Sequence, residues 1–119
     1  MARLTDGELE VMRILWERGE MKPAEIQERF PRPIKNSALR SYLSILVEKG
    51  HVARRKVGKA FFYRPRTRRE NAFRSTLRSL INTFCAGSTE ALMATLIRSE
   101  NLSREELLKI KRLADETKE

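Results

Sequence analysis

Residues 36–50 read NSALRSYLSILVEKG and residues 51–64 read HVARRKVGKAFFYR, and these two runs decide the fold. In the first run apolar residues recur every three or four positions, which predicts a helix over 37–49 that ends at Gly50. Asn36 or Ser37 is its expected N-cap. In the second run the period falls to about two, which predicts strands over 51–57 and 60–64. Gly58-Lys59 then forms a two-residue hairpin turn with positive φ at its first residue. The expected buried face of the helix is Leu39, Leu43, Leu46 and Val47.

Two further helices are expected before this stretch. Thr5 followed by Glu8 is a capping-box pattern, which predicts the start of a helix that ends near Gly19. Its apolar stripe is Leu9, Met12, Leu15 and Trp16. Pro23 suits the first position of a second, short helix that carries the apolar pair Ile26 and Phe30, before prolines 31 and 33 end it. Three helices followed by a hairpin is the order of a winged helix-turn-helix, whose third helix enters the major groove of DNA.

The chain returns to helical periodicity after the hairpin. Thr67 with Glu70, and Ser103 with Glu106, repeat the capping-box pattern, and a break is expected at 86–88. The predicted fold class is therefore mainly α with a small β-hairpin. A winged helix-turn-helix DNA-binding domain covers residues 1–68, and a C-terminal helical dimerisation region covers residues 69–119.

The C-terminal helices carry more apolar surface than a short segment can bury alone. One interpretation packs this surface on the chain's own winged domain. The interpretation we favour packs it on the same helices of a second chain in a symmetric dimer. The predicted dimer interface is Phe73, Leu77, Leu80, Ile81, Phe84, Leu92, Leu96, Leu107 and Ile110.

Positive charge is concentrated between Arg32 and Arg69. Twelve basic residues against one acid give this window a net charge of +11, while the whole chain has +9. Such segregation is typical of proteins that bind nucleic acid, although a basic hairpin can also be a charged edge that resists aggregation. Arg40 is expected to reach guanine and the hairpin to hold phosphates. The predicted DNA-binding residues are Lys35, Asn36, Ser37, Ala38, Arg40, Ser41, Ser44, Arg54, Arg55, Lys56 and Lys59.

Composition argues against other classes of protein. One histidine, one cysteine and no glycine-rich phosphate loop leave no basis for an enzyme, a metal site or a bound cofactor. Cys85 is expected to be a buried structural cysteine, with a redox role as the alternative. The sequence has no apolar run near the roughly 20 residues of a membrane span, so we expect a cytoplasmic protein without a membrane partner.

Several motifs in order resemble the BlaI/MecI/CopY family of bacterial repressors, the penicillinase-repressor family. They are LTDGELEVM at 4–12 with Leu15-Trp16, LSILVEKG at 43–50, Phe61-Phe62-Tyr63, and NLSREEL at 101–107. The resemblance implies a dimeric winged-helix repressor on a palindromic operator. Its recognition-helix contacts would fall on Ser37, Ala38, Arg40 and Ser41, and its hairpin contact on Arg54.

The sequence departs from that family at three places. Ile45 stands where the family usually has arginine. Thr95-Leu96 stands where the antibiotic-sensing branch has the Asn-Phe pair cut by a regulatory protease, so that partner is not supported. The paired cysteines of the copper-responsive branch are missing. The function expected from sequence is thus a sequence-specific repressor acting as a homodimer on double-stranded DNA, and the alternative is a non-specific architectural DNA- or RNA-binding protein. The operator, the target genes, the inducing signal and the release mechanism are left open.

Overall fold

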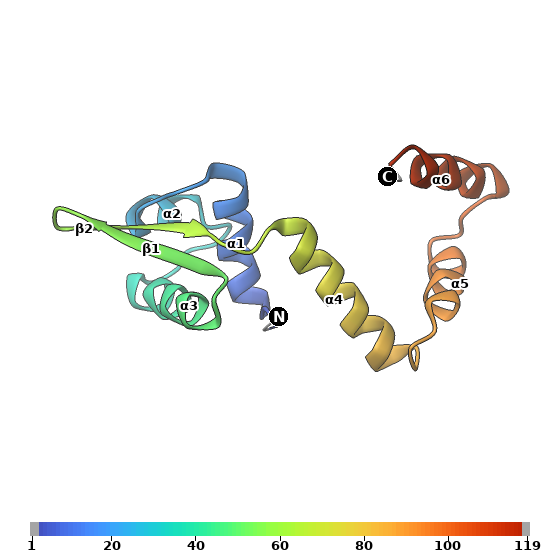
Figure 1. Ribbon diagram of the computed structural model, residues 1–119, viewed down its shortest axis with the longest axis horizontal. Coiled ribbons are helices and arrows are strands. Elements are labelled where there is room, and N and C mark those ends of the chain that lie inside the picture. The colour runs from blue at the N-terminus through green and yellow to red at the C-terminus, as the bar shows by residue number, and fades with distance from the viewer. Residues whose placement is uncertain (1–2, 118–119) are drawn as a thin grey trace. The chain divides into compact units, whose positions relative to one another are not determined.

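The computed structural model describes residues 3–117, and its chain divides into two compact units. The first unit ends at Thr76 and the second begins at Leu77, so the division falls inside a helix that both units share. The elements in chain order are α1 (Asp6–Arg18), α2 (Pro23–Arg29), α3 (Asn36–Lys49), β1 (Val52–Val57), β2 (Ala60–Pro65), α4 (Arg69–Phe84), α5 (Thr89–Ser99) and α6 (Arg104–Glu116) (Figure 1). The predicted class, mainly helical with one antiparallel hairpin, is confirmed.

The core of the first unit lies between α1, α2, α3 and the base of the hairpin. Its buried side chains are Val11, Met12, Ile14, Leu15, Met21, Ile26, Phe30, Leu39, Leu43, Leu46, Val52 and Tyr63. The prediction for Leu9 is wrong, because this side chain is 38% exposed. Positions 8, 11, 12 and 15 form the core-facing stripe of α1, so Glu8 takes the inward place and Leu9 falls on the flank.

The ends of the helices agree with the capping patterns at two of three sites. The boxes at Thr5 and Ser103 are both present. The box predicted at Thr67 is wrong, because α4 begins at Arg69 and the Thr67 hydroxyl lies 2.7 Å from Nδ1 of buried His51. The Thr67 carbonyl also accepts a 2.8 Å hydrogen bond from the indole N–H of Trp16, so Thr67 joins the end of the hairpin to α1.

The start of α3 also differs from its prediction. The helix begins at Asn36, and the residue in the cap position is Lys35, which makes no side-chain cap bond. Asn36 is not the cap because its side chain bonds to neighbouring side chains instead. Gly50 ends the helix as predicted, with a left-handed φ of 84°.

The hairpin has a register that pairs Val57 with Ala60 across its turn. Gly58 has a φ of +62°, as its place in the turn requires. At the base, Met21 and Tyr63 exchange backbone hydrogen bonds of 2.9 and 2.8 Å. This bridge anchors the second strand to the segment between α1 and α2, so only the outer part of the hairpin projects from the unit.

An ion pair between buried Glu8 and half-buried Lys49 joins α1 to the end of α3. Lys49 Nζ donates to Glu8 Oε1 at 2.7 Å and to the Arg3 carbonyl at 2.9 Å, while the backbone N–H of Thr5 donates to the same Glu8 oxygen. Burial raises the pKa of Glu8, but the hydrogen bonds from Lys49 and Thr5 outweigh it and bring the pKa below its ordinary value. The ionised carboxylate is therefore the form that the fold stabilises.

We expect Glu8→Gln to lower the free energy of unfolding by about 1.5 kcal/mol at pH 7, since Lys49 loses its partner. A lowered folded-state pKa gives stability that is present above the unfolded pKa of about 4.3 and is lost as pH falls through the folded value. The difference between the variant and the parent chain should therefore narrow near pH 3. Urea unfolding at pH 7 and pH 3 measures this difference in the free energy of unfolding. Glu17→Gln, on the exposed face of α1, is the matched control. An equal loss at both pH values would contradict the role of the charge.

The second unit holds the end of α4 with α5 and α6. Ser88 caps α5 by accepting a 3.1 Å hydrogen bond from the N–H of Ala91, and the Thr95-Leu96 pair lies within this helix. No single helix among residues 3–117 is long and apolar enough to cross a membrane, and α4 and α5 meet the length and composition criteria only as a pair bent by 93°.

The helices after the hairpin, α4 to α6, leave much of their apolar surface exposed. Of the predicted interface residues, Phe73, Leu77, Leu80, Phe84, Leu96 and Ile110 are exposed, and Leu92 and Leu107 are half-buried. Ile81 is an exception at 3% exposure. The chain turns back just after α4, where the N–H of Gly87 donates to the Ile81 carbonyl. Ile81 therefore has little surface left to offer a partner.

Candidate nucleic-acid interface

The outer face of α3 is an exposed surface of small polar residues around one arginine. Ser37, Arg40, Ser41, Ser44 and Ile45 line a shallow open depression of about 480 Å³. The remaining predicted residues at the start of this helix, Lys35, Asn36 and Ala38, are also exposed. The structure thus places six of the predicted residues on α3 and the seventh, Lys35, at its cap position. Short side chains of this kind let a helix approach base edges closely.

Arg40 is held in place by a chain of hydrogen bonds that begins in α2. Its Nε donates to Asn36 Oδ1 at 2.8 Å, Asn36 Nδ2 donates to Gln27 Oε1 at 3.5 Å, and Gln27 Nε2 donates to the Ile34 carbonyl at 2.9 Å. A carbonyl can only accept, so Ile34 fixes the orientation of the Gln27 amide and, through it, that of Asn36. The two terminal nitrogens of Arg40 lie outside this chain of bonds. Gln27 was not predicted from the sequence, because no sequence pattern indicates a hydrogen bond between side chains of two different helices.

The two faces of the hairpin carry different basic residues. Arg54 and Lys56 share a face with Tyr63 and Phe61, their direct partners across the strands. The Arg54 guanidinium lies 5.0 Å from the centroid of the Phe61 ring, and Lys56 Nζ lies 5.6 Å from it. These contacts hold both charged groups near one aromatic ring, while the two residues remain exposed.

Arg55 points to the opposite face and is paired within the chain. Its Nε and one terminal nitrogen donate to the two carboxylate oxygens of Glu20 at 2.9 and 2.7 Å. The hydrogen bonds from Arg55 lower the pKa of Glu20, and those to Glu20 raise the pKa of Arg55. A phosphate at Arg55 would have to displace this carboxylate. Glu20 therefore competes with phosphate for Arg55. Among the described residues, no ion pair of this kind involves Arg54 or Lys56.

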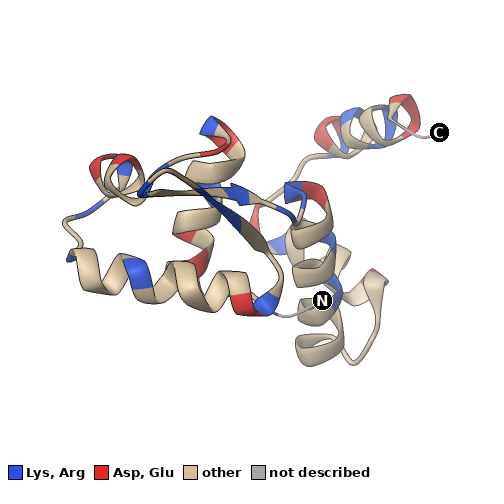
Figure 2. Ribbon diagram, turned by 60° about the vertical axis from the view of Figure 1, so that its left-hand side comes forward, with Lys and Arg blue, Asp and Glu red and all other residues tan. Residues whose placement is uncertain are grey.

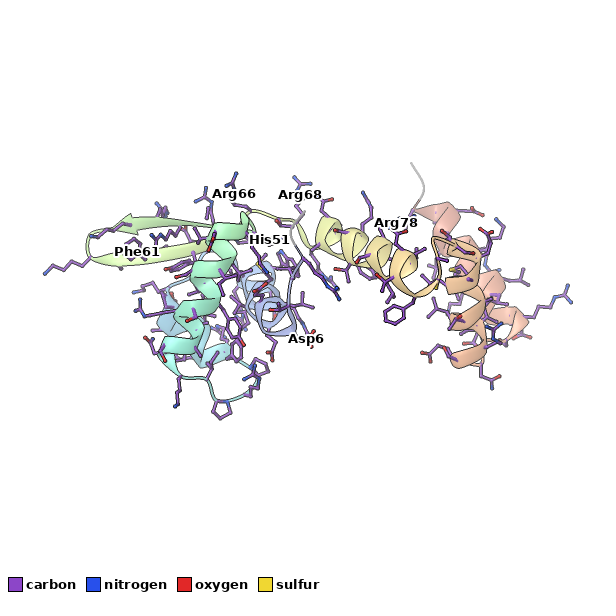
Figure 3. The ribbon with its side chains drawn as sticks, turned by 90° about the horizontal axis from the view of Figure 1, so that it is seen from below. Asp6, His51, Phe61, Arg66, Arg68 and Arg78 are labelled. Atoms are coloured by element: carbon purple, nitrogen blue, oxygen red, sulfur yellow. The ribbon has the colours of Figure 1, made fainter. Side chains whose placement is uncertain are left out.

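Basic residues gather on the hairpin side of the first unit. Figure 2 shows them along both strands and midway along α3, while most acids of this unit lie on α1 and α2 and near the end of α3. Arg66 and Arg68 follow the hairpin, and in Figure 3 their side chains point to the same side, away from the helices. Both are exposed, so they extend the basic surface beyond the predicted residues.

Among residues 3–117 no three or more His, Cys, Asp or Glu side chains come together in a way that could hold a metal ion. The expectation that Cys85 is buried is wrong, because this residue is only half-buried at the break after α4, in the second unit.

Comparison with known sequences identifies one family. The penicillinase repressor family profile matches residues 4–116 of this chain. The penicillinase repressor of Bacillus licheniformis is 24% identical over 123 residues, covering 98% of this chain and 92% of that protein. An uncharacterized 16.5 kDa protein from Latilactobacillus sakei is 27% identical and covers 92% of this chain and 77% of that protein.

Comparison with solved structures identifies the fold. The YusO protein of Bacillus subtilis has a TM-score of 0.56 at 25% identity, covering 95% of this chain and 73% of that one. A multiple antibiotic-resistance repressor from Listeria monocytogenes has a TM-score of 0.55 at 20% identity, with coverages of 95% and 71%. A MarR mutant from E. coli, solved with operator DNA, has a TM-score of 0.52 at 19% identity, with coverages of 95% and 74%. These solved structures therefore show that the chain shares their fold.

Proposed function

The chain belongs to the penicillinase repressor family and is a DNA-binding transcriptional repressor; from this premise we propose that it acts as a homodimer on a palindromic operator. One observation supports the proposal most strongly. The small polar face of α3 and a hairpin with exposed cations lie in the same compact unit. The first of these suits base edges and the second suits phosphates. In winged helix-turn-helix proteins that recognise a DNA sequence, the recognition helix is likewise expected to contact bases and the hairpin, or wing, to contact phosphates.

Sequence reading is assigned to α3. The terminal nitrogens of Arg40 can fork onto the O6 and N7 acceptors of guanine, while Ser37 and Ser41 lie on the same exposed face for shorter contacts. Asn36 orients Arg40 before DNA arrives, which lowers the entropy lost on binding. Arg54 and Lys56 hold the phosphate backbone and fix the register of α3 on the duplex.

Dimer formation is assigned to the helices after the hairpin, and α4 gives the strongest support. Phe73, Leu77, Leu80 and Phe84 follow one another at spacings of four, three and four residues, and their exposures lie between 37% and 78%. This spacing is that of a coiled-coil seam, in which each side chain inserts between those of a facing helix. A second copy of α4 offers the same seam, so a symmetric pair buries both.

The proposal is tested by selecting bound duplexes from a random pool. We expect a palindromic site that is protected as two half-sites in a footprint, because operator symmetry mirrors the symmetry of the protein. Affinity for this site should fall steeply with salt, since several phosphates per half-site release counterions. Coating of any duplex in proportion to its length, with no enriched sequence, would instead favour a non-specific architectural protein.

A further inference from the structure

Ile45 is an exposed apolar side chain in the middle of the polar, basic surface of α3. It is 39% exposed and lines the same depression as Arg40, Ser41 and Ser44. It lies one helical turn beyond Ser41 and two beyond Ser37, so the three share a face. Single exposed apolar residues are common on proteins, but this one lies on the surface that the proposed function presents to bases.

Two properties of this position limit what Ile45 can contact. The window around it carries a net charge of +11, so a polyanion is the expected occupant of the surface. In the major groove, the C5-methyl of thymine is the apolar group on a base edge, beside hydrogen-bonding donors and acceptors. An isoleucine side chain can neither donate nor accept a hydrogen bond, so the thymine methyl is the base group that matches it.

We propose that Ile45 packs against the 5-methyl group of a thymine in each operator half-site and so determines one base pair of the sequence. This inference rests on the proposed function. With a rise of 1.5 Å per residue, Ile45 lies about 7.5 Å along α3 from Arg40, which is roughly two base-pair steps of B-DNA. The thymine is therefore expected within two or three base pairs of the guanine that Arg40 reads.

The test removes the methyl group from the DNA and the side chain from the protein in turn. Each thymine of the selected site is replaced singly by uracil, which keeps the hydrogen bonds of the base and lacks only the methyl. For the parent chain we expect one thymine per half-site at which uracil weakens binding about three- to fivefold, the effect of losing one buried methyl contact. Ile45→Ala should bind thymine and uracil equally there, and Ile45→Val should keep part of the discrimination.

Leu9→Ala is the matched control, because Leu9 is also on a helix and is 38% exposed, but belongs to α1. It should discriminate thymine from uracil as the parent chain does. A uracil effect that persists in Ile45→Ala, or no uracil effect at any thymine of an otherwise specific site, would overturn the role of Ile45 and leave the repressor proposal standing. A selection that enriches no sequence would overturn both.

Discussion

Replacing Arg40 with alanine, which removes one guanine contact from each half-site of the proposed dimer, should weaken binding to the selected operator by about 30-fold or more and leave binding to random duplex within about twofold. A bidentate pair with guanine contributes roughly 1–3 kcal/mol of discrimination, and alanine removes both donors. Random duplexes are held through phosphates, which Arg54 and Lys56 still contact. Fluorescence anisotropy with labelled operator and scrambled duplex at one salt concentration gives the ratio directly.

Lys56→Ala is the matched control for charge. Lys56 makes no acidic contact in the structure of residues 3–117, so its removal deletes one phosphate contact without freeing a carboxylate. The affinities for the operator and for random duplex should fall by similar factors. The slope of log affinity against log salt concentration should lessen by about one for each protomer, or about two for the proposed dimer. Arg55 is a poorer control, because its loss also leaves Glu20 unpaired near the hairpin.

Arg40→Lys separates the shape of the side chain from its charge. Lysine keeps the positive charge but has no planar fork, and it cannot reproduce the bond from Nε to Asn36. We therefore expect its operator-to-random ratio to fall most of the way toward that of the alanine variant. An unchanged ratio in Arg40→Ala would move sequence reading away from this residue.

The sequence was enough to predict α3 and the hairpin because local chemistry decides them. Gly50 and Gly58 adopt the left-handed φ that their places require, and the change of apolar period between them predicts the change from helix to strand. Leu9 was misassigned for the opposite reason. The stripe of α1 includes a carboxylate, Glu8, whose burial depends on Lys49, 41 residues away. The spacing of apolar residues does not reveal that a charged side chain is buried when its burial depends on a partner far away in the sequence.

The exposure of the predicted DNA-binding residues follows from the sequence to the same extent, while their contacts within the chain do not. An exposed helix face follows from helical spacing, so the shared exposed face of the α3 residues could be predicted from the sequence. The alternation of a strand places Arg54 and Arg55 on opposite faces, but only the fold brings Glu20 to one of them. The contact of Gln27 with Asn36 likewise depends on how α2 meets α3. Contacts between elements, rather than the elements themselves, are what the sequence left undetermined.

Replacing Leu80 with glutamate should convert the proposed dimer into a monomer and weaken operator binding by 100-fold or more. Leu80 lies within the α4 seam and is 40% exposed, so the single chain tolerates the change while a facing helix would have to bury an unpaired carboxylate. A dimer that binds two half-sites at once has an affinity about 10² to 10⁴ times higher than that for one half-site, and a monomer loses this increase in affinity. Binding to an isolated half-site should stay unchanged.

Light scattering at micromolar concentration measures whether the protein is a dimer or a monomer. The parent chain should give about twice the 13.9 kDa chain mass, and Leu80→Glu the mass of a single chain. Leu9→Glu adds the same charge to a side chain of similar exposure on α1, outside the proposed interface, and should remain a dimer with parental operator affinity. If Leu80→Glu still scattered as a dimer, the α4 seam would not be the interface. If the parent chain were itself a monomer at this concentration, a palindromic operator would lose its physical basis, because nothing would link its two halves.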